Sequence, residues 1–331
     1  MSKVTGVPPA AAVYRSLAEV PAEFGPSVAA IGNFDGVHCG HREILAAVVA
    51  EARERNARAV AITFDPHPEQ VLRPERAPLL ITPLAERLRL LAGTGVDAIL
   101  VLRFDMELAR LTAREFVQRI LVDALGVCGV HEGESFRFGK GAAAGVSELA
   151  EFGAEFGFTV RVHPGVRIRG LEVSSSAVRA LVAAGDMRRA RWMLGRPFAV
   201  LSTPARGRGI GTKLLVPTVN LAPYSGLLPA LGVYVTRLRI GGRVFQSVTN
   251  VGNRPTFGEA SFAVESHILD FDPVELHPTE DLSVGTPILT DETPLELEFL
   301  LRLRSEIKFP SPDALKAQIL RDIARAKRYF R

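Results

Sequence analysis

Two histidines, His38 and His41, lie three residues apart in a glycine-rich loop near the start of the chain. The loop follows a short apolar run, residues 28–31, and precedes a segment whose apolar residues repeat with helical spacing. Three glycines punctuate it: Gly32, Gly36 and Gly40. Glycine lets the backbone approach a phosphate closely, and the first turn of a helix directs free N–H groups at an anion. The pattern predicts a strand, a loop and a helix that bind a phosphorylated ligand, with both imidazoles facing it.

Two other interpretations of these histidines stay open. They could simply cap the helix that follows the loop, as polar side chains often do. They could also ligate a metal together with Cys39. Metal ligation is the weaker interpretation, because adjacent His and Cys residues rarely converge on one ion and no second ligand pair follows at zinc spacing.

The full segment Gly32-Asn-Phe-Asp-Gly-Val-His-Cys-Gly-His41 resembles the nucleotidylyltransferase signature. It looks like the longer form found in bacterial bifunctional riboflavin kinase/FAD synthetases. The resemblance implies that the first half transfers AMP from ATP to FMN, with His38 and His41 as catalytic residues. It adds three further nucleotide-binding residues to the glycines: Asn33, Phe34 and Asp35.

The segment Gly133-Glu-Ser-Phe-Arg-Phe-Gly-Lys-Gly141 resembles the second nucleotide motif of the same family. The resemblance implies nucleotide contacts at Ser135, Phe138 and Gly139. Two residues depart from the family pattern, which usually has Asn or Asp at position 135 and Asp at position 146, where this chain has Val146. A hydroxyl can still donate to a phosphate or hold a water on Mg²⁺, whereas a valine cannot.

Residues 173–179, Val-Ser-Ser-Ser-Ala-Val-Arg, combine hydroxyls, a helix start and a guanidinium, which together form a second anion site. The family has Ser-Ser-Thr-x-x-Arg here, in contact with the triphosphate. The resemblance therefore implies that Ser175 and Ser176 bind the nucleotide and that Arg179 is catalytic. It also implies that the segment Pro66, His67 and Pro68 binds flavin, although by itself His67 reads as part of a surface turn.

The second half carries a different set of motifs. A glycine-rich loop predicts nucleotide binding at three positions: Gly207, Gly209 and Gly211. The segment that follows, Val216-Pro-Thr-Val-Asn-Leu221, resembles the Pro-Thr-Ala-Asn motif of riboflavin kinases. The resemblance implies that Thr218 and Asn220 hold Mg²⁺ and phosphate, and Mg²⁺ prefers such hard oxygen ligands.

Three more residues complete the resemblance to riboflavin kinases. Glu265 is expected to be the general base that takes the proton of the riboflavin 5′-hydroxyl. Asn250 and Arg304 are expected to bind flavin. Without the motif around it, Glu265 would read as an ordinary solvated glutamate on a strand.

The elements of the first half alternate between strands and helices, which predicts a Rossmann-like doubly wound parallel sheet. Expected strands cover 59–64 and 97–104, and expected helices cover 82–91 and 111–125. Thr82 and Thr112 are the expected helix caps. Residues 1–27 read as a loosely structured lead-in. A ligand should bind beyond the carboxyl ends of the strands.

From Phe198 onward, apolar residues alternate with a period of two. The pattern predicts a hairpin over 233–251, a strand over 262–271 and a strand over 295–304 with strict alternation. A final helix begins at Pro312, with Ser311 as its cap. These elements predict a small antiparallel β-barrel with a C-terminal helix. The expected domains are an FMN adenylyltransferase over 1–194 and a riboflavin kinase over 195–331.

Composition limits the setting of the protein. The 331 residues carry a net charge of +4, which suits anionic small molecules without requiring nucleic acid. Two cysteines, Cys39 and Cys128, cannot form a disulfide framework and suit a reducing cytoplasm. No apolar run approaches the ~20 residues that cross a bilayer, and the start lacks the order of a signal peptide.

The sequence therefore predicts a cytoplasmic bifunctional riboflavin kinase/FAD synthetase. Its expected ligands are ATP, riboflavin, FMN and FAD, with Mg²⁺ as cofactor and with neither nucleic acid nor membrane as a partner. A monomer or weak homo-oligomer is expected. Two alternatives remain: a riboflavin kinase with a degenerate adenylylating half, and a non-catalytic flavin- or RNA-binding module suggested by the basic final helix.

Overall fold

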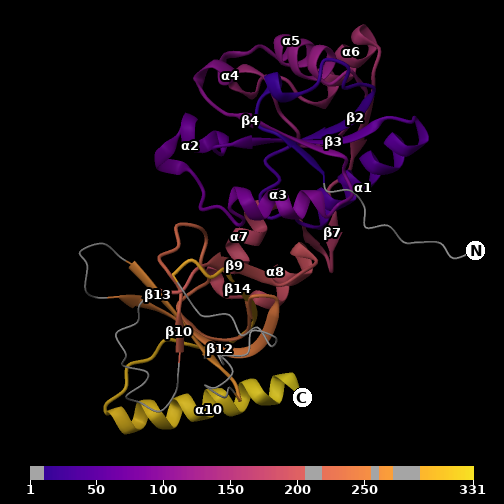
Figure 1. Cartoon of the computed structure of the whole chain (residues 1–331). Helices are drawn as coiled ribbons and strands as arrows, with labels where there is room; N and C mark the ends of the chain where they lie inside the picture. Colours follow the sequence, from indigo (N-terminus) through magenta and orange to yellow (C-terminus); the bar gives the residue numbers. More distant parts are fainter. Residues whose placement is uncertain (1–10, 206–217, 255–260, 271–290) are drawn as a thin grey trace, which may run out of the picture. The chain divides into compact units, whose positions relative to one another are not determined.

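The computed structural model describes residues 11–205, 218–254, 261–270 and 291–331. The chain forms two compact units, Met1–Ser175 and Ser176–Arg331 (Figure 1). The glycine loop with Gly207, Gly209 and Gly211 lies outside the described residues, so its predicted role stays a prediction.

The first unit contains a six-stranded parallel sheet, which confirms the predicted doubly wound class. In sheet order its strands are β1 (Ala12–Tyr14), β4 (Ala98–Arg103), β3 (Arg58–Asp65), β2 (Ser27–Ile31), β5 (Val127–Gly133) and β6 (Thr159–His163). Strand β1 pairs with β4, so the lead-in expected to be loosely structured contributes an edge strand. The prediction missed it because three residues are too few to show a period.

Helices cover both faces of this sheet (Figure 1). On one face, α1 (Cys39–Glu54) and α3 (Leu84–Ala92) pack on Val28, Ala30 and their neighbours. On the other face, α5 (Ala113–Phe116), the π-helical η3 (Val117–Ala124) and α6 (Val146–Phe156) pack on Ala29, Ile31 and their neighbours. The remaining short elements are η1 (Leu17–Glu19), α2 (Pro68–Leu72), η2 (Pro74–Arg76), α4 (Met106–Arg110), η4 (Lys140–Ala142), β7 (Arg167–Ile168) and β8 (Leu171–Glu172).

The two helix caps predicted for this half had different outcomes. Thr112 caps α5 as expected: its Oγ1 accepts from the Glu115 amide at 3.2 Å, and the Glu115 carboxylate accepts from the Thr112 amide at 2.9 Å. Thr82 was wrong as a cap, because α3 begins only at Leu84 and its N-cap is Pro83. The Thr82 hydroxyl instead accepts from the amide of Gly36, a contact between segments distant in sequence.

The second unit is built on a curled, six-stranded antiparallel half-barrel, which confirms the predicted class. In sheet order its strands are β10 (Thr218–Asn220), β13 (Ser261–Ile268), β12 (Arg243–Arg254), β11 (Gly232–Ile240), β14 (Leu295–Ser305) and β9 (Phe198–Ser202). Its helices are α7 (Ser175–Ala184), which starts at the last residue of the first unit, α8 (Met187–Leu194) and the C-terminal α10 (Pro312–Phe330). Ser311 caps α10 as predicted, accepting from the Ala314 amide at 3.2 Å.

The expected alternation along β14 breaks in its second half. The pairing with β11 shifts register twice, and Leu300 and Leu303 have no opposite residue. Such bulges turn neighbouring side chains to the other face of a sheet. Both leucines pack in a cluster with Val233, Val235 and Ala326 of α10. The prediction of one continuous apolar face over 295–303 was therefore wrong.

The compact units divide at Ser175, about twenty residues before the predicted domain limit of 194/195. Helix α8 packs on β9 and β14 and so belongs to the second unit. The limits of the two catalytic domains stay a prediction. In the described part of the chain, no helix is long and apolar enough to cross a membrane.

Candidate active sites

His38 closes the loop between β2 and α1 and is the N-cap of α1. Its Nδ1 accepts a hydrogen bond from the His41 amide at 3.3 Å, and the side chain is buried, with 6% of the residue exposed. Because Nδ1 accepts, the neutral ring carries its proton on Nε2. The capping interpretation is thus correct for His38, and the cap places the proton of the neutral ring on Nε2.

His41 stacks on His38 with ring centroids 3.6 Å apart, and the Phe34 ring meets it edge-on. Burial, and secondarily the neighbouring His38, hold the pKa of His41 well below its ordinary value. Its buried Nδ1 has no hydrogen-bond partner among the described residues. The loop therefore presents two stacked imidazoles, and the lowered pKa of His41 favours its neutral form, which suits hydrogen bonding to phosphate oxygens.

Asp35 was predicted to bind nucleotide, but its carboxylate is completely buried and faces inward. It accepts from the amides of Ile81 and Thr82 at 3.0 and 2.9 Å and from the Thr82 hydroxyl at 3.2 Å. The loop between β2 and α1 is thereby fixed to the segment that precedes α3. This contact maintains left-handed backbone at three loop residues: Phe34, Gly36 and Val37.

Replacing Asp35 by alanine is expected to lower the free energy of unfolding by about 2–4 kcal/mol, because buried amides lose a charged acceptor. Urea unfolding measures the change. The matched control is Asp105→Ala, which removes a carboxylate that accepts from the Glu107 and Leu108 amides at an exposed helix start and should cost about 1 kcal/mol. Equal losses in the two variants would contradict the clamping role of Asp35.

Sequence reasoning missed Arg87, a fully buried residue of α3. Its two terminal nitrogens donate to the carbonyls of Asn33 at 2.8 Å and Phe64 at 2.9 Å. Burial lowers the pKa of the guanidinium, although Asp35 and Asp65 oppose that change. Arg87 therefore ties the loop that follows β2 to the end of strand β3. In sequence it reads as one more charge on an amphipathic helix, so nothing local could have identified it.

His67 follows β3 and is also a buried helix cap. Its Nδ1 accepts from the Glu69 amide at 3.2 Å, and its own amide donates to Gln70 Oε1 at 3.1 Å. The surface-turn interpretation was wrong, because the side chain is 7% exposed. Flavin binding by Pro66, His67 and Pro68 stays a prediction.

The loop after β5 places its predicted residues in different environments. The Phe138 side chain packs in the core against Phe116 and Phe136. Gly139 has a φ of 74°, and a Cβ there would lie 2.8 Å from the backbone nitrogen of Ala113, so only glycine fits. Ser135 is exposed, and Val146 is the first residue of α6. Nucleotide contact by this loop stays a prediction.

The serine motif reaches the glycine loop through Ser175. Its Oγ donates to the carbonyl of Asp35 at 2.8 Å. Ser176 and Arg179 belong to α7 in the second compact unit, and their predicted contacts with the triphosphate stay predictions. The structure thus brings His38, His41, Asp35 and Ser175 to one loop.

In the second unit, three predicted residues form a single row across three strands. Asn220 of β10 lies opposite Glu265 of β13, and Glu265 lies opposite Asn250 of β12. Directly opposite residues point to the same face, with Cβ atoms ~5 Å apart. Thr218, two residues before Asn220, shares that face. Glu265 is exposed, so a substrate hydroxyl can reach its carboxylate.

Arg304 extends this row through Val233 of β11. Its Nε donates to Asp322 Oδ2 of α10 at 2.8 Å, and its guanidinium lies over the Phe309 ring at 5.7 Å. Asp322 is almost fully buried and also accepts from Gln318 at 2.9 Å. Sequence reasoning missed Asp322, because only the docking of α10 buries it.

Replacing Asp322 by asparagine is expected to raise the KM for riboflavin about tenfold, because Arg304 loses the charged partner that holds it. FMN adenylylation should keep its rate. Steady-state kinetics of both reactions on one preparation measures the effect. A variant that loses both activities together would instead indicate general unfolding, and an unchanged KM would contradict the positioning of Arg304 by Asp322.

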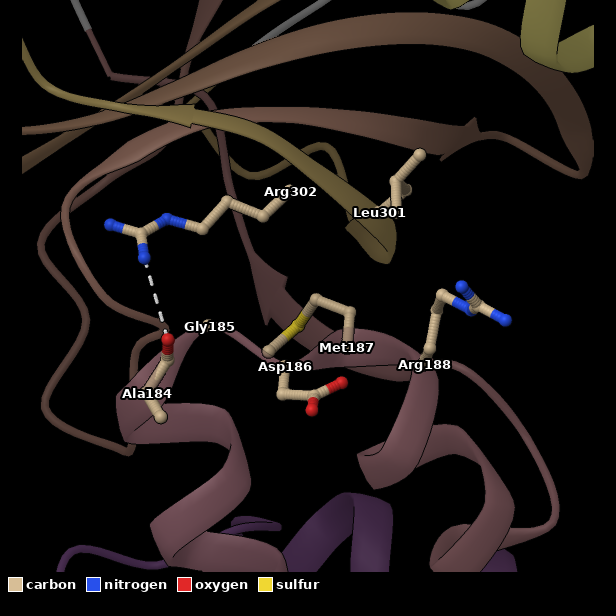
Figure 2. A pocket seen from close by; sticks show the side chains of 7 residues that line it. All are labelled: Ala184, Gly185, Asp186, Met187, Arg188, Leu301 and Arg302. Carbon is tan, nitrogen blue, oxygen red and sulfur yellow. Dashed lines mark hydrogen bonds between the residues drawn. The ribbon is translucent and has the colours of Figure 1, made fainter.

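Figure 2 shows a pocket of about 280 Å³ in the second unit, between the turn that joins α7 to α8 and strand β14. Its lining consists of Ala184, Gly185, Asp186, Met187, Arg188, Leu301 and Arg302. The Arg302 guanidinium turns toward the Ala184 carbonyl at 3.4 Å, and Asp186 caps α8. None of the predicted site residues lines this pocket, so we assign it to neither active site.

Comparisons with known proteins identify the family of this chain. A family model for FAD synthetase matches residues 20–177, and one for riboflavin kinase matches residues 194–330. The bifunctional riboflavin kinase/FMN adenylyltransferase of Pseudomonas fluorescens is 37% identical over 314 residues, covering 95% of this chain and 96% of its own length. The enzyme of the same name from Escherichia coli K12 is 35% identical and covers 96% of both chains.

Among solved structures, the crystal structure of a macrolide-efflux protein from Streptococcus pneumoniae matches with a TM-score of 0.82 and 26% identity, over 96% of this chain and 99% of that one. Both enzyme domains are present in order, and the relatives match over almost the whole length. The chain therefore belongs to the family of bifunctional riboflavin kinase/FMN adenylyltransferases, with its FAD synthetase half first and its riboflavin kinase half second.

Proposed function

We propose specific residue roles for the two reactions of this enzyme. In the second unit, the Glu265 carboxylate takes the proton of the riboflavin 5′-hydroxyl as that oxygen attacks the γ-phosphorus of ATP and ADP leaves. The row of Asn220, Glu265 and Asn250 carries this proposal. It sets a carboxylate between two amides on one face of the sheet, so a base and two orienting groups are available to one substrate.

In the first unit, a phosphate oxygen of FMN attacks the α-phosphorus of ATP in line, and pyrophosphate leaves. The protein forms no covalent bond, so it accelerates the step by positioning and by hydrogen bonds to the developing charge. The Nε2–H of His38, the loop amides and His41 supply those donors. The capping bond from the His41 amide supports this role, because it fixes which His38 nitrogen carries the proton.

Both family activities use ATP, and we propose Mg²⁺ as the accompanying cation. Thr218 and Asn220 offer the hard oxygen ligands that suit it and would hold it in the second unit. The described part of the chain has no group of three or more His, Cys, Asp or Glu residues that could hold a metal. When bound there, Mg²⁺ would neutralise part of the charge on the substrate phosphates. The free cysteines Cys39 and Cys128 support a cytoplasmic location.

The test is chromatography of flavins after incubation of the pure protein with riboflavin, ATP and Mg²⁺. FMN followed by FAD is the expected result. FMN alone would favour a degenerate first half, and the variant Ser135→Asn/Val146→Asp should then restore FAD formation. Neither product would contradict the proposal and favour a binding module.

A further inference from the structure

Glu132 is a buried acid near the carboxyl end of strand β5. Neither of the two reactions described above uses it. It is the second-last residue of β5 and is 3% exposed. Its Oε1 accepts from the backbone amide of Ile31 at 2.6 Å. Ile31 ends β2 and directly precedes Gly32, so the Glu132 side chain fixes the point from which the glycine loop starts.

The position coincides with the place where the sheet changes winding direction. Strands β2 and β5 are neighbours, but the chain leaves β2 for α1 on one face and leaves β5 for α6 on the other (Figure 1). The two connections therefore leave the sheet in opposite directions, and doubly wound folds bind their ligands at such a point, beyond the carboxyl ends of the strands. Glu132 lies at the carboxyl end of β5, the strand that pairs with β2 at this point.

The surroundings of the Glu132 carboxyl favour its protonated form. Burial raises its pKa well above the ordinary value, and the Ile31 bond opposes this only partly. No charged side chain of the described residues acts on it. The preceding residue, His131, forms hydrogen bonds with Glu51 at 3.0 Å and His163 at 2.9 Å. It lies on the opposite face of the sheet from Glu132, because successive strand residues point to opposite faces.

One oxygen of this acid remains available. The bond that Oε1 accepts from Ile31 is the only hydrogen bond of the Glu132 side chain among the described residues, which leaves Oε2 for a ligand. The other acids near this loop are engaged with backbone amides: Glu134 accepts from Gly165 at 3.2 Å and Glu148 from Gly145 at 2.7 Å. Glu132 differs from these two acids in its burial, because it is 3% exposed whereas Glu134 and Glu148 are exposed.

We propose that Glu132 is a further substrate-binding residue for adenylylation, which holds the Ile31 amide through Oε1 and donates the proton on Oε2 to a phosphate oxygen of ATP. The inference rests on the proposed binding of ATP at the glycine loop. A protonated acid suits this place, since a carboxylate under a phosphate would repel it. A protonated Glu132 would also supply a hydrogen-bond donor next to the segment in which Ser135 and Val146 replace the family's usual polar residues.

Three variants test the contact: Glu132→Gln, Glu132→Met and the control Glu134→Gln. Glutamine keeps both an acceptor for Ile31 and a donor for phosphate, whereas methionine keeps only the size. We expect Glu132→Met to lower kcat/KM for ATP in FAD formation by about 10–100-fold, with riboflavin phosphorylation unchanged. We expect Glu132→Gln and the control to stay within about threefold of wild type at pH 7.

The pH profile separates this contact from a purely structural role. Wild-type kcat/KM should fall as the pH rises through the raised pKa of Glu132, and Glu132→Gln should remove this alkaline fall. Titration of His41 does not contribute to this alkaline fall, because the pKa of His41 is lowered and the ring therefore titrates at acid pH. An alkaline fall of equal size in Glu132→Gln would overturn the proposal, whether or not Glu132→Met folds.

Binding of a non-hydrolysable analogue, α,β-methylene ATP, is measured by calorimetry in parallel. A weaker Kd in Glu132→Met than in Glu134→Gln supports the contact, and equal values overturn it. This readout does not need FAD formation, so failure of the Glu132 contact is distinguished from failure of the first unit to adenylylate FMN.

Discussion

Replacing Glu265 by glutamine is expected to lower the kcat of riboflavin phosphorylation by about 10²–10⁴-fold. Glutamine keeps the size and the hydrogen-bonding reach of the side chain but cannot accept the proton of the 5′-hydroxyl. Its neighbours across the sheet, Asn220 and Asn250, should still bind substrate, so the KM for riboflavin should change little. A fall in kcat with constant KM is the signature of a group that acts in the transition state.

The control for this variant is Glu296→Gln, another strand glutamate of the same half-barrel. Glu296 pairs with Arg239 at 3.3 Å on the surface, and such pairs contribute about 1 kcal/mol or less. It should leave both activities unchanged. FMN adenylylation by the first unit provides a second control in the same sample. If Glu265→Gln phosphorylated riboflavin at the wild-type rate, Glu265 would not be the base.

Replacing His38 by asparagine is expected to lower the rate of FAD formation from FMN by about 10²–10³-fold, the usual cost of one preorganised donor. Asparagine is a good N-cap, so α1 should keep its first turn. The imidazole Nε2–H is lost, and the amide group of asparagine is too short to replace it. Stopped assays of FAD formation at saturating FMN and ATP measure the effect.

Comparison with His38→Ala separates the two roles of this residue. Alanine removes the cap as well as the imidazole, so it should cost about 1 kcal/mol of stability beyond the asparagine variant. Both variants should lose adenylylation to a similar degree, and both should phosphorylate riboflavin normally. Full FAD synthesis by His38→Asn would show that His38 is only a helix cap.

Local sequence was sufficient for features that depend on near neighbours. Helix caps at Thr112 and Ser311 follow from a side chain and an amide three residues apart, and both are confirmed. The placement of His38 and His41 in one loop follows in the same way. Strand and helix periods also gave the two fold classes, because burial on one face leaves a regular pattern in the chain.

Features that depend on distant segments were not readable from the sequence. Arg87, Asp322 and Glu132 look like surface charges, and only the packing of remote strands and helices buries them. The bulges of β14 arise from its pairing with β11.

The two candidate sites illustrate the same division. Motifs identified Asn220, Glu265 and Asn250, but their alignment is set by the register of three strands, and a shift of one residue would turn each side chain to the opposite face. Similarly, the sequence placed Asp35 in a phosphate loop, whereas its bonds to Ile81 and Thr82 make it a clamp. Residue types thus set the chemistry that is available. Long-range pairing and desolvation, which no local pattern encodes, decide which groups meet and in which protonation state.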